Sequence, residues 1–284
     1  MKLLYPWLLA IRPKTLLVGL CPVYLGCGFA WHLGQIRPFV AMTTILTSLL
    51  IQIACNMTND YYDFIKGADT AERVGPTRVS QAGLIRPETM KHAIIAVFSL
   101  AFAMGMVLVY VGGWTIFVIG ILSLLSAYAY TGGPCPLAYL GLGDVFAFMF
   151  FGPIAVGGSY FLQSGYLSTE ALILGLCPGA FSVAMLAVNN VRDLEQDRKA
   201  AKQTLVVRLG KTFGRLEYTV ALLLGIAIPM FYFKAPFLGI LFLPAGVFIW
   251  KMWHSNQSEL NPLLAKTAVL LLLLSLLFSY YLFT

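Results

Sequence analysis

An apolar run of the sequence ends in the acidic stretch Asn56-Met-Thr-Asn-Asp-Tyr-Tyr-Asp-Phe-Ile-Lys-Gly-Ala-Asp69. On an α-helix Asn56, Asp60 and Asp63 would share one face, because they are spaced i, i+4 and i+7. Carboxylates and amides at this density repel one another and are costly to remove from water unless a cation neutralises them. Oxygen ligands of this kind suit Mg²⁺. The stretch therefore predicts a magnesium-binding motif at the end of a membrane-length helix.

A second acidic stretch, Asn189-Asn-Val-Arg-Asp-Leu-Glu-Gln-Asp197, repeats the pattern far downstream. There Asn189, Asp193 and Asp197 are spaced i, i+4 and i+8, again on one helical face. A solvated helix cap is the ordinary explanation of one such cluster, but two clusters with matched spacing favour a shared site. Two facing clusters could hold two or three metal ions and a diphosphate between them.

The composition places the chain among polytopic membrane proteins. Apolar residues make up 59% of the sequence and charged residues 11%, whereas a soluble domain carries roughly 25% charged residues. The mean hydropathy is +0.82. We assign the net charge of +7 to loops that set the membrane topology rather than to nucleic-acid binding. The five cysteines include no C-x-x-C pair and the three histidines show no ligand spacing, so neither disulfides nor a zinc site is expected.

We expect a single all-α membrane domain over residues 1–284, with nine transmembrane helices. The nine apolar segments are 15–33, 38–57, 91–111, 114–131, 144–163, 170–190, 216–233, 235–252 and 264–283. The acidic stretches end the second and the sixth segment, so a period of four helices relates them. This period predicts two four-helix units plus a ninth helix. The preceding run, Leu3 to Ile11, is expected to be a short interfacial helix rather than a cleavable signal.

The distribution of lysine and arginine predicts the orientation. If the N-terminus is cytoplasmic, 17 of the 19 basic residues lie on the cytoplasmic side, and only Arg37 and Lys234 lie outside. This bias favours a cytoplasmic N-terminus and an external C-terminus. Both acidic stretches then lie at the cytoplasmic edge of the membrane, where an ionic substrate made in the cytoplasm reaches them.

Basic residues follow both acidic stretches. Arg73 and Arg78 come after the first, and Arg198, Lys199 and Lys202 come after the second. Carboxylates that hold Mg²⁺ beside guanidinium and ammonium groups form a diphosphate site, and in an apolar surrounding such a site promotes departure of diphosphate from an allylic carbon. The carbocation left behind needs a dry pocket with π faces. Candidate aromatic residues are Tyr61, Tyr62, Phe64, Tyr128, Tyr130 and Tyr139.

Three stretches of the sequence resemble the UbiA superfamily of intramembrane prenyltransferases and, within it, the 1,4-dihydroxy-2-naphthoate polyprenyltransferases of menaquinone biosynthesis. They are Asn59–Pro76, Tyr130-Thr-Gly-Gly-Pro134 with Gly141-Leu-Gly-Asp144, and Asn189–Lys202 running on to Arg208-Leu-Gly210. The resemblance covers essentially the whole chain. One departure concerns the first motif, which the wider superfamily often writes as N-D-x-x-D-x-x-x-D. Gly67 stands at its last position here and Asp69 follows two residues later, so we assign no metal role to Asp69.

The resemblance implies Mg²⁺-dependent transfer of a polyprenyl group from polyprenyl diphosphate to 1,4-dihydroxy-2-naphthoate, giving demethylmenaquinone with loss of CO₂ and diphosphate. The implied metal ligands are Asp60, Asp63, Asp193, Asp197 and Asn59. The implied substrate-binding residues are Asn56, Asn59, Lys66, Arg73, Arg78, Tyr130, Asn189, Arg198, Lys199 and Lys202. The four aspartates are also implied to be catalytic, together with Asp144, which is expected to accept a phenolic proton. The expected location is a bacterial inner membrane, with the active site on the cytoplasmic side, a lipid bilayer around it, and no nucleic-acid or protein partner.

Two alternatives stay open at this point. Within the same superfamily, the acceptor could be another naphthoate, 4-hydroxybenzoate, a chlorin, haem or a lipid headgroup. A secondary transporter also combines internal repeats with membrane carboxylates, but it places its coupling residues near the bilayer midplane in broken helices. Carboxylates at helix ends beside basic loops favour the enzyme over the transporter.

Overall fold

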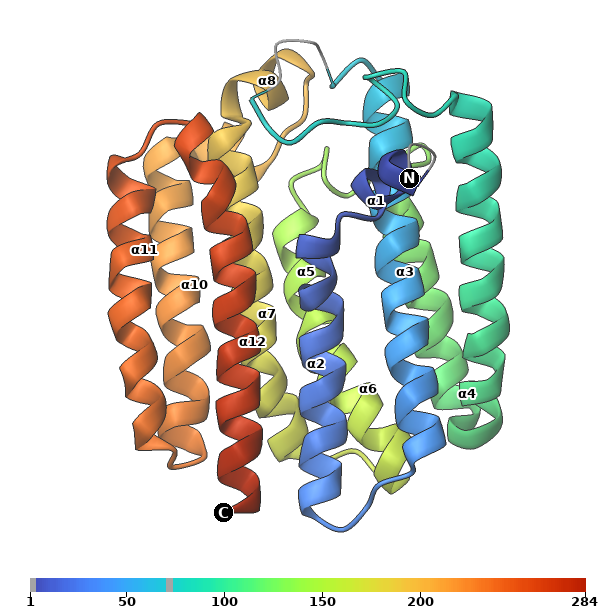
Figure 1. Cartoon of the computed structure of the whole chain (residues 1–284), viewed down its shortest axis with the longest axis vertical. Helices are drawn as coiled ribbons and strands as arrows, with labels where there is room; N and C mark the ends of the chain where they lie inside the picture. Colours follow the sequence, from blue (N-terminus) through green and yellow to red (C-terminus); the bar gives the residue numbers. More distant parts are fainter. Residues whose placement is uncertain (1–3, 70–73) are drawn as a thin grey trace.

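The chain folds as a bundle of helices with both acidic stretches at one end, which is the upper end in Figure 1. The computed structural model describes residues 4–69 and 74–284, and every regular element within them is a helix. The elements are α1 (Leu4–Ile11), α2 (Pro13–His32), α3 (Pro38–Ile65), α4 (Pro87–Ala129), α5 (Gly143–Phe151), α6 (Pro153–Ser164), α7 (Thr169–Arg192), α8 (Leu194–Lys199), α9 (Leu205–Leu209), α10 (Lys211–Tyr232), η1 (Pro236–Leu241), α11 (Phe242–His254), η2 (Ser258–Leu260) and α12 (Asn261–Phe283). The predicted all-α class is confirmed.

Eight helices in the described part of the chain are long and apolar enough to cross a membrane, whereas the sequence predicted nine. The difference lies in α4, which spans 43 residues as two helical arms joined at Gly113 and contains the predicted segment 91–111 and most of 114–131. A straight helix of this length would extend about 65 Å, more than twice the ~30 Å thickness of the hydrocarbon core. Instead α4 reverses at Gly113, where φ is 62° and ψ is −151°, a conformation that favours glycine. Figure 1 shows α4 turning at its lower end into a second arm.

The predicted segment 144–163 forms two helices, α5 and α6, because the chain breaks at Gly152 and Pro153. The break lies directly against the backbone of α7. A Cβ atom added to Gly175 would be 2.7 Å from Pro153 Cα, and one added to Gly179 would be 2.8 Å from the Phe148 carbonyl oxygen. Small residues allow such close approach between helices in a membrane. The break therefore fixes α5, which carries Asp144, against α7.

α7 is buried along most of its length and carries the second acidic stretch at its C-terminal end. Its small residues Ala180, Ala184 and Ala187 are buried. Gly225 of α10 contacts Phe181 so closely that an added Cβ would lie 2.6 Å from the ring. Packing of this kind stabilises helix association where lipid and side chains are equally apolar. The position of Asp193 at the end of α7 is thus set by the core of the bundle.

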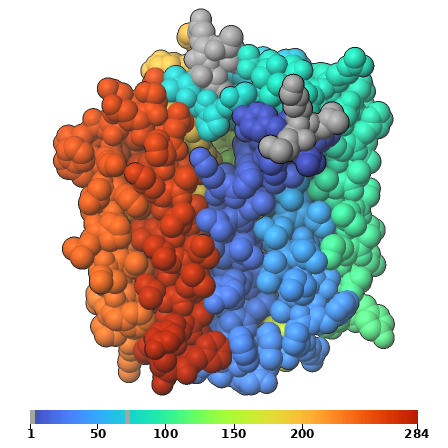
Figure 2. Space-filling view, in the orientation of Figure 1, coloured from blue at the N-terminus to red at the C-terminus, as the bar shows by residue number. Residues whose placement is uncertain are grey.

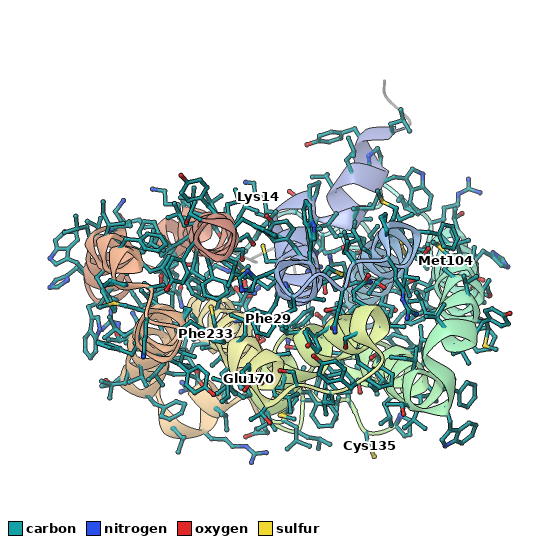
Figure 3. All side chains as sticks on the ribbon, turned by 90° about the horizontal axis from the view of Figure 1, so that it is seen from below. Lys14, Phe29, Met104, Cys135, Glu170 and Phe233 are labelled. Carbon is teal, nitrogen blue, oxygen red and sulfur yellow. The ribbon has the colours of Figure 1, made fainter. Side chains whose placement is uncertain are left out.

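Aromatic side chains pack together at the end opposite the acidic stretches. The ring centroid of Phe29 in α2 lies 5.6 Å from that of Tyr160 in α6 and 5.9 Å from that of Phe233, which follows α10. Figure 3 shows Phe29 and Phe233 close together when the bundle is seen from this end. Phe278 of α12 continues the cluster, 5.2 Å from Phe233. Such pairs bury a large apolar area, so this end of the bundle is held by apolar packing while the polar side chains gather at the other.

Candidate active site

The two acidic stretches meet at the upper end of the bundle, although they are far apart in the sequence. A small pocket of about 20 Å³ lies between them, and we call it the acidic pocket. Its lining residues are Asp63, Ala68, Asp69, Arg78, Asp193, Gln196, Asp197 and Lys202. A volume of this size accommodates roughly one water molecule or ion. The predicted convergence of the two motifs on one site therefore agrees with the structure.

A much larger cavity, of about 720 Å³, lies next to the acidic pocket within the bundle. The two share five lining residues, Asp63, Arg78, Asp193, Asp197 and Lys202. Much of the remaining wall is apolar, and α4 contributes more lining residues than any other helix. Apolar lining residues include Phe102, Met106, Val109, Phe117, Phe146 and Phe150. Figure 2 shows a hollow between the upper ends of α2 and α12, and Lys14 and Ala265 from these two ends line the cavity.

Asp63 is the residue of the first stretch that contacts both the cavity and its basic neighbours. It is buried, and it accepts hydrogen bonds from the Tyr139 hydroxyl at 3.0 Å and from Arg78 Nη2 at 3.3 Å. Arg78 Nε also lies 3.1 Å from Asp69 Oδ2. Among the described residues the third nitrogen of this buried guanidinium, Nη1, has no hydrogen-bond partner. Arg78 thus bridges two carboxylates and keeps one donor available beside the cavity.

Asp60 lies in a different environment from Asp63. Its side chain is buried, and its two oxygens accept hydrogen bonds from the backbone amides of Val79 at 2.9 Å and Ser80 at 2.8 Å. Asp60 lines neither the acidic pocket nor the large cavity. Its contacts hold the loop that carries Arg78 against α3. The metal role of Asp60 stays a prediction. The structure also shows that this carboxylate holds the loop that carries Arg78, which the sequence pattern did not indicate.

In the second stretch, Asp193 is held by the residue that precedes it. Arg192 donates from Nε to Asp193 Oδ1 at 2.7 Å and from Nη2 to Asp193 Oδ2 at 2.6 Å. Asp197 lies 3.6 Å from Lys202 Nζ. The sequence reasoning used Arg192 only to set the topology. Arg192 directly precedes Asp193 in the sequence, and this adjacency is the feature from which the ion pair could have been predicted.

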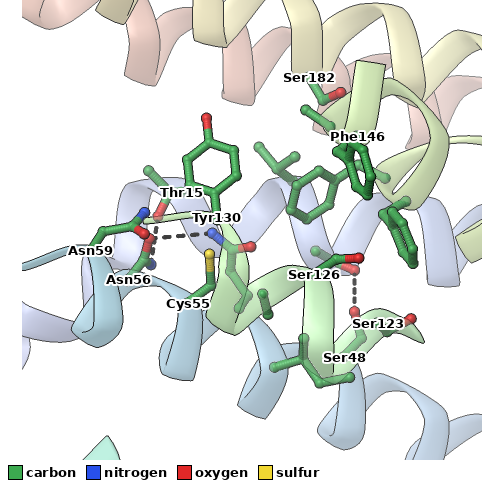
Figure 4. Close-up of a pocket in the computed structure, with 18 of the residues that line it drawn as sticks. Thr15, Ser48, Cys55, Asn56, Asn59, Ser123, Ser126, Tyr130, Phe146 and Ser182 are labelled. Carbon is green, nitrogen blue, oxygen red and sulfur yellow. Dashed lines mark hydrogen bonds between the residues drawn. The ribbon is translucent and has the colours of Figure 1, made fainter. Parts of the chain in front are cut away.

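The asparagines of the first stretch face the large cavity from α3, and Figure 4 shows Asn56 and Asn59 beside Tyr130. Asn56 Nδ2 donates to the Ile11 carbonyl at 2.9 Å and to Thr15 Oγ1 at 3.0 Å, which ties α3 to the junction of α1 and α2. Asn59 Oδ1 accepts a hydrogen bond of 2.8 Å from Thr131. Asn189 of the second stretch also lines the cavity. These bonds orient the amides of both predicted asparagines on α3.

The connection between α4 and α5 brings Tyr139 between two ammonium groups. Lys66 Nζ lies 4.6 Å and Lys202 Nζ 5.5 Å from the centre of the Tyr139 ring, within the range of cation–π attraction. Lys66 also donates a hydrogen bond of 2.6 Å to the Thr131 carbonyl. Burial raises the pKa of Tyr139 above its ordinary value, and the neighbouring Asp63 carboxylate adds to this. Tyr139 therefore remains a neutral hydrogen-bond donor to Asp63.

Asp144 begins α5 at the wall of the large cavity. Its side chain is buried, and its Oδ1 atom has no hydrogen-bond partner among the described residues. Tyr130 lines the cavity nearby, since its hydroxyl lies 3.2 Å from the position that a Cβ atom on Gly143 would take. Burial raises the pKa of Tyr130, and the Asp144 charge adds to the effect. A buried carboxylate oxygen without a partner is costly, and in a cavity wall it is available to accept a proton from a ligand.

Two predicted substrate-binding residues, Arg198 and Lys199, are not part of this arrangement. Arg198 is exposed and pairs with Glu195 at 3.3 Å, and Lys199 is also exposed. Neither lines the acidic pocket or the large cavity. Arg73 lies outside the described residues. Polar lining residues that the sequence reasoning did not assign to the site are Arg12, Lys14, Asn190, Arg192 and Asn261.

The donor set around the acidic pocket fits Mg²⁺ by its chemistry. Carboxylate and amide oxygens are the ligands that this hard cation takes in proteins. In the described part of the chain, no three His, Cys, Asp or Glu side chains gather closely enough to hold a metal ion as they stand. The carboxylates are neutralised by Arg78, Arg192 and Lys202 instead. A bound Mg²⁺–diphosphate would offer positive charge to the carboxylates and negative charge to the basic side chains. Contacts with the metal and the phosphate could then replace the present ion pairs.

Comparison with known proteins identifies the family. Residues 19–277 match the profile of the UbiA prenyltransferase family. The chain is 36% identical over 287 residues to the 1,4-dihydroxy-2-naphthoate octaprenyltransferase of Escherichia coli (strain K12), which covers 96% of this chain and 93% of that protein. It is 35% identical over 289 residues to the protein of the same name from Haemophilus influenzae, which covers 96% and 94% of the two chains.

Solved structures show the same fold. A UbiA homologue from Archaeoglobus fulgidus, solved bound to GPP and Mg²⁺, has a TM-score of 0.71 at 14% sequence identity. The similarity covers 98% of this chain and 99% of that chain. The match over residues 19–277 and the shared helical fold agree, and the chain is an integral membrane protein that belongs to the UbiA prenyltransferase family.

Proposed function

We propose that the protein transfers a polyprenyl group from polyprenyl diphosphate to 1,4-dihydroxy-2-naphthoate in menaquinone biosynthesis, giving demethylmenaquinone. The observation that carries this proposal is that the acidic pocket shares five lining residues with a cavity of about 720 Å³ whose wall is largely apolar. Such a site takes a charged head at one end and a long hydrocarbon at the other. The names of the bacterial relatives support the naphthoate as the acceptor.

The charged head would lie at the acidic pocket. Asp63, Asp193 and Asp197 would hold Mg²⁺ there, with Asn59 and Asp60 as further predicted ligands, and the bound ion supplies positive charge that stabilises the departing diphosphate. Arg78 offers a buried guanidinium with a donor that is not yet used, and a guanidinium binds phosphate oxygens in a bidentate manner. Lys202 contributes a second cation from the other acidic stretch. Both side chains would turn from their carboxylates to the phosphate oxygens when substrate binds.

The prenyl chain would occupy the apolar part of the cavity between α4 and α5. When the carbon–oxygen bond of the prenyl diphosphate breaks, its electron pair leaves with the diphosphate and an allylic cation remains. Phe146 and Tyr130 line the cavity and present π faces that favour positive charge. The apolar wall also keeps water away from the cation, so the aromatic acceptor captures it instead.

Asp144 is the candidate acceptor of the phenolic proton. Asp144 lines the cavity and its buried Oδ1 atom has no hydrogen-bond partner among the described residues, and the loss of the phenolic proton would make the acceptor ring a better nucleophile. Tyr130 is unsuited to the same role, because its raised pKa keeps the phenol protonated. A new carbon–carbon bond forms at the ring, and CO₂ leaves from the carboxylated carbon while the electron pair of the broken bond stays on the ring. The product of the transfer is the dihydroxy form, and a two-electron oxidant from solution, such as dissolved O₂, converts it to the quinone in a separate step.

Release of inorganic diphosphate by the purified protein tests the proposal. We expect release to require polyprenyl diphosphate, dihydroxynaphthoate and Mg²⁺ together, to stop with EDTA and to return with added MgCl₂. Asp193→Asn should reduce the rate about a thousandfold, because metal-assisted charge stabilisation supplies several kcal/mol and each 1.36 kcal/mol is about tenfold in rate. Glu195→Gln, an exposed change in the same stretch, is the matched control and should keep the wild-type rate. Release that continues unchanged in EDTA would contradict the metal assignment.

A further inference from the structure

Asn261, the first residue of α12, connects the two halves of the site through hydrogen bonds to both. Its Oδ1 atom accepts a hydrogen bond of 3.1 Å from Arg192 Nη1, at the end of α7. Its Nδ2 atom donates a hydrogen bond of 3.0 Å to the carbonyl of Val74, in the loop after α3. Asn261 also lines the large cavity. One side chain thus reaches both the loop that follows the first acidic stretch and a residue within the second.

The bond to Arg192 bears on the orientation of Asp193. Arg192 is buried, and its Nε and Nη2 atoms already hold the two oxygens of Asp193 at 2.7 and 2.6 Å. Because the guanidinium is planar and rigid, fixing Nη1 by Asn261 fixes the plane in which the Asp193 carboxylate is held. The orientation of the Asp193 carboxylate is therefore set by Arg192 and, through it, by Asn261.

The bond to Val74 bears on the position of Arg78. The loop segment 74–80 is held at one end by Asn261 and at the other by Asp60, which accepts the amides of Val79 and Ser80 at 2.9 and 2.8 Å. Arg78 lies between these two attachments, with Nη2 at 3.3 Å from Asp63. Releasing one attachment would let the guanidinium move relative to the acidic pocket.

We infer that Asn261 is a positioning residue for the diphosphate site, which holds the Arg192–Asp193 pair and the Arg78 loop in one fixed arrangement. The inference rests on the proposed function, since it assumes that the acidic pocket binds a metal diphosphate. An asparagine suits the task because it offers one acceptor and two donors on a short side chain. Aspartate at this position would keep the acceptor for Arg192 and lose the donor for Val74, whereas alanine would lose both.

Binding of inorganic diphosphate with MgCl₂ to the purified full-length protein tests this role without turnover. The midpoint of thermal unfolding should rise with ligand concentration in the wild type, and this rise gives an apparent Kd. We expect Asn261→Ala to weaken the apparent Kd about tenfold and Asn261→Asp to weaken it about threefold, in line with the loss of a charged and of a neutral hydrogen bond. Asn256→Ala is the matched control, because Asn256 is exposed in the same connection between α11 and α12. It should leave the Kd unchanged.

The possible outcomes separate positioning from mere stability. If Asn261→Ala lowers the unfolding midpoint without ligand but keeps the wild-type Kd, the residue is only structural and the inference is overturned. If Asn261→Ala does not fold, the apparent Kd is measured on Asn261→Asp instead. A wild-type Kd in that variant also overturns the inference. A wild-type protein whose midpoint does not respond to MgCl₂ with diphosphate would overturn the proposed function itself, and the inference with it.

Discussion

The guanidinium of Arg78 lies 3.3 Å from the carboxylate of Asp63, and both side chains are buried at the edge of the large cavity. The two residues are 15 positions apart, so the loop after α3 folds back over the end of that helix. Arg78 also contacts Asp69 at 3.1 Å, and its Nη1 atom has no partner among the described residues. The Arg78 guanidinium thus contacts two carboxylates and keeps a donor nitrogen without a partner among the described residues. These features suit it to bind an anionic substrate.

Arg78→Lys is the first test of this placement. Lysine keeps the positive charge but cannot bridge two carboxylates and a phosphate with a planar set of donors. We expect the KM for polyprenyl diphosphate to rise about tenfold or more, because hydrogen bonds to charged groups contribute about 1.5–3 kcal/mol. Arg86→Lys, an exposed change at the end of the same loop, is the control. Steady-state kinetics would contradict this assignment if both variants had the same KM.

Asp60 and Asp63 make different contacts, so replacing each of them with asparagine should cause a different defect. Asp63→Asn should reduce turnover by about a thousandfold, since metal-assisted charge stabilisation supplies several kcal/mol, and it should also lower the unfolding temperature because it breaks a buried ion pair with Arg78. Asp60→Asn should reduce the free energy of unfolding by about 1–3 kcal/mol, because an amide cannot accept from Val79 and Ser80 with both of its heavy atoms.

Thermal unfolding and single-turnover rates on the same two preparations distinguish the residues. A stable Asp60→Asn protein that has lost all turnover would show that Asp60 acts at the metal, as the sequence pattern predicts, rather than through the loop.

Asp144→Asn tests the proton acceptor. The amide has nearly the same shape but no longer takes up a proton, so turnover should fall about a hundredfold or more, within the usual range of general-base catalysis. Binding of MgCl₂ with inorganic diphosphate should stay at the wild-type level, because Asp144 does not line the acidic pocket. A variant with wild-type turnover would remove Asp144 from the mechanism.

Cys135 provides a test of orientation in the native protein. It is exposed in the connection between α4 and α5, whereas the other four cysteines are buried or half-buried. Tyr139 of the same connection contacts Asp63, so Cys135 belongs to the end of the bundle that carries the acidic stretches. If that end is cytoplasmic, a membrane-impermeant maleimide should label inverted vesicles and spare intact spheroplasts, and Cys135→Ser should abolish the labelling. Labelling of intact spheroplasts at Cys135 would reverse the predicted topology.

Much of the fold could be predicted because its determinants are local. The spacing of Asp60 and Asp63, and of Asp193 and Asp197, follows helical periodicity, and apolar runs of membrane length mark the helices around them. The count of nine spans stays a prediction, and the predicted segments 91–111 and 114–131 lie largely on the two arms of α4 that meet at the reversal at Gly113. Sequence pattern alone does not distinguish such a reversal from a loop.

The contacts within the site could not be predicted in the same way, because they depend on where distant segments return. Asp60 had the same helical spacing as a metal ligand, and only the position of the Val79 and Ser80 amides gives it another role. Asn261 is 69 residues from Arg192, in a stretch with no motif. Arg198 follows the second acidic stretch directly, yet α8 presents it to solvent beside Glu195.

The acceptor is the central claim, and product analysis tests it most directly. Membranes that contain the protein are incubated with polyprenyl diphosphate, MgCl₂ and an equal mixture of 1,4-dihydroxy-2-naphthoate and 4-hydroxybenzoate, and the lipid extract is analysed by mass spectrometry. We expect a prenylated naphthoquinone that has lost CO₂, with little prenylated hydroxybenzoate, and no product from membranes that contain the Asp193→Asn variant. Prenylated 4-hydroxybenzoate without any naphthoquinone would contradict the account and leave only membership of the UbiA prenyltransferase family.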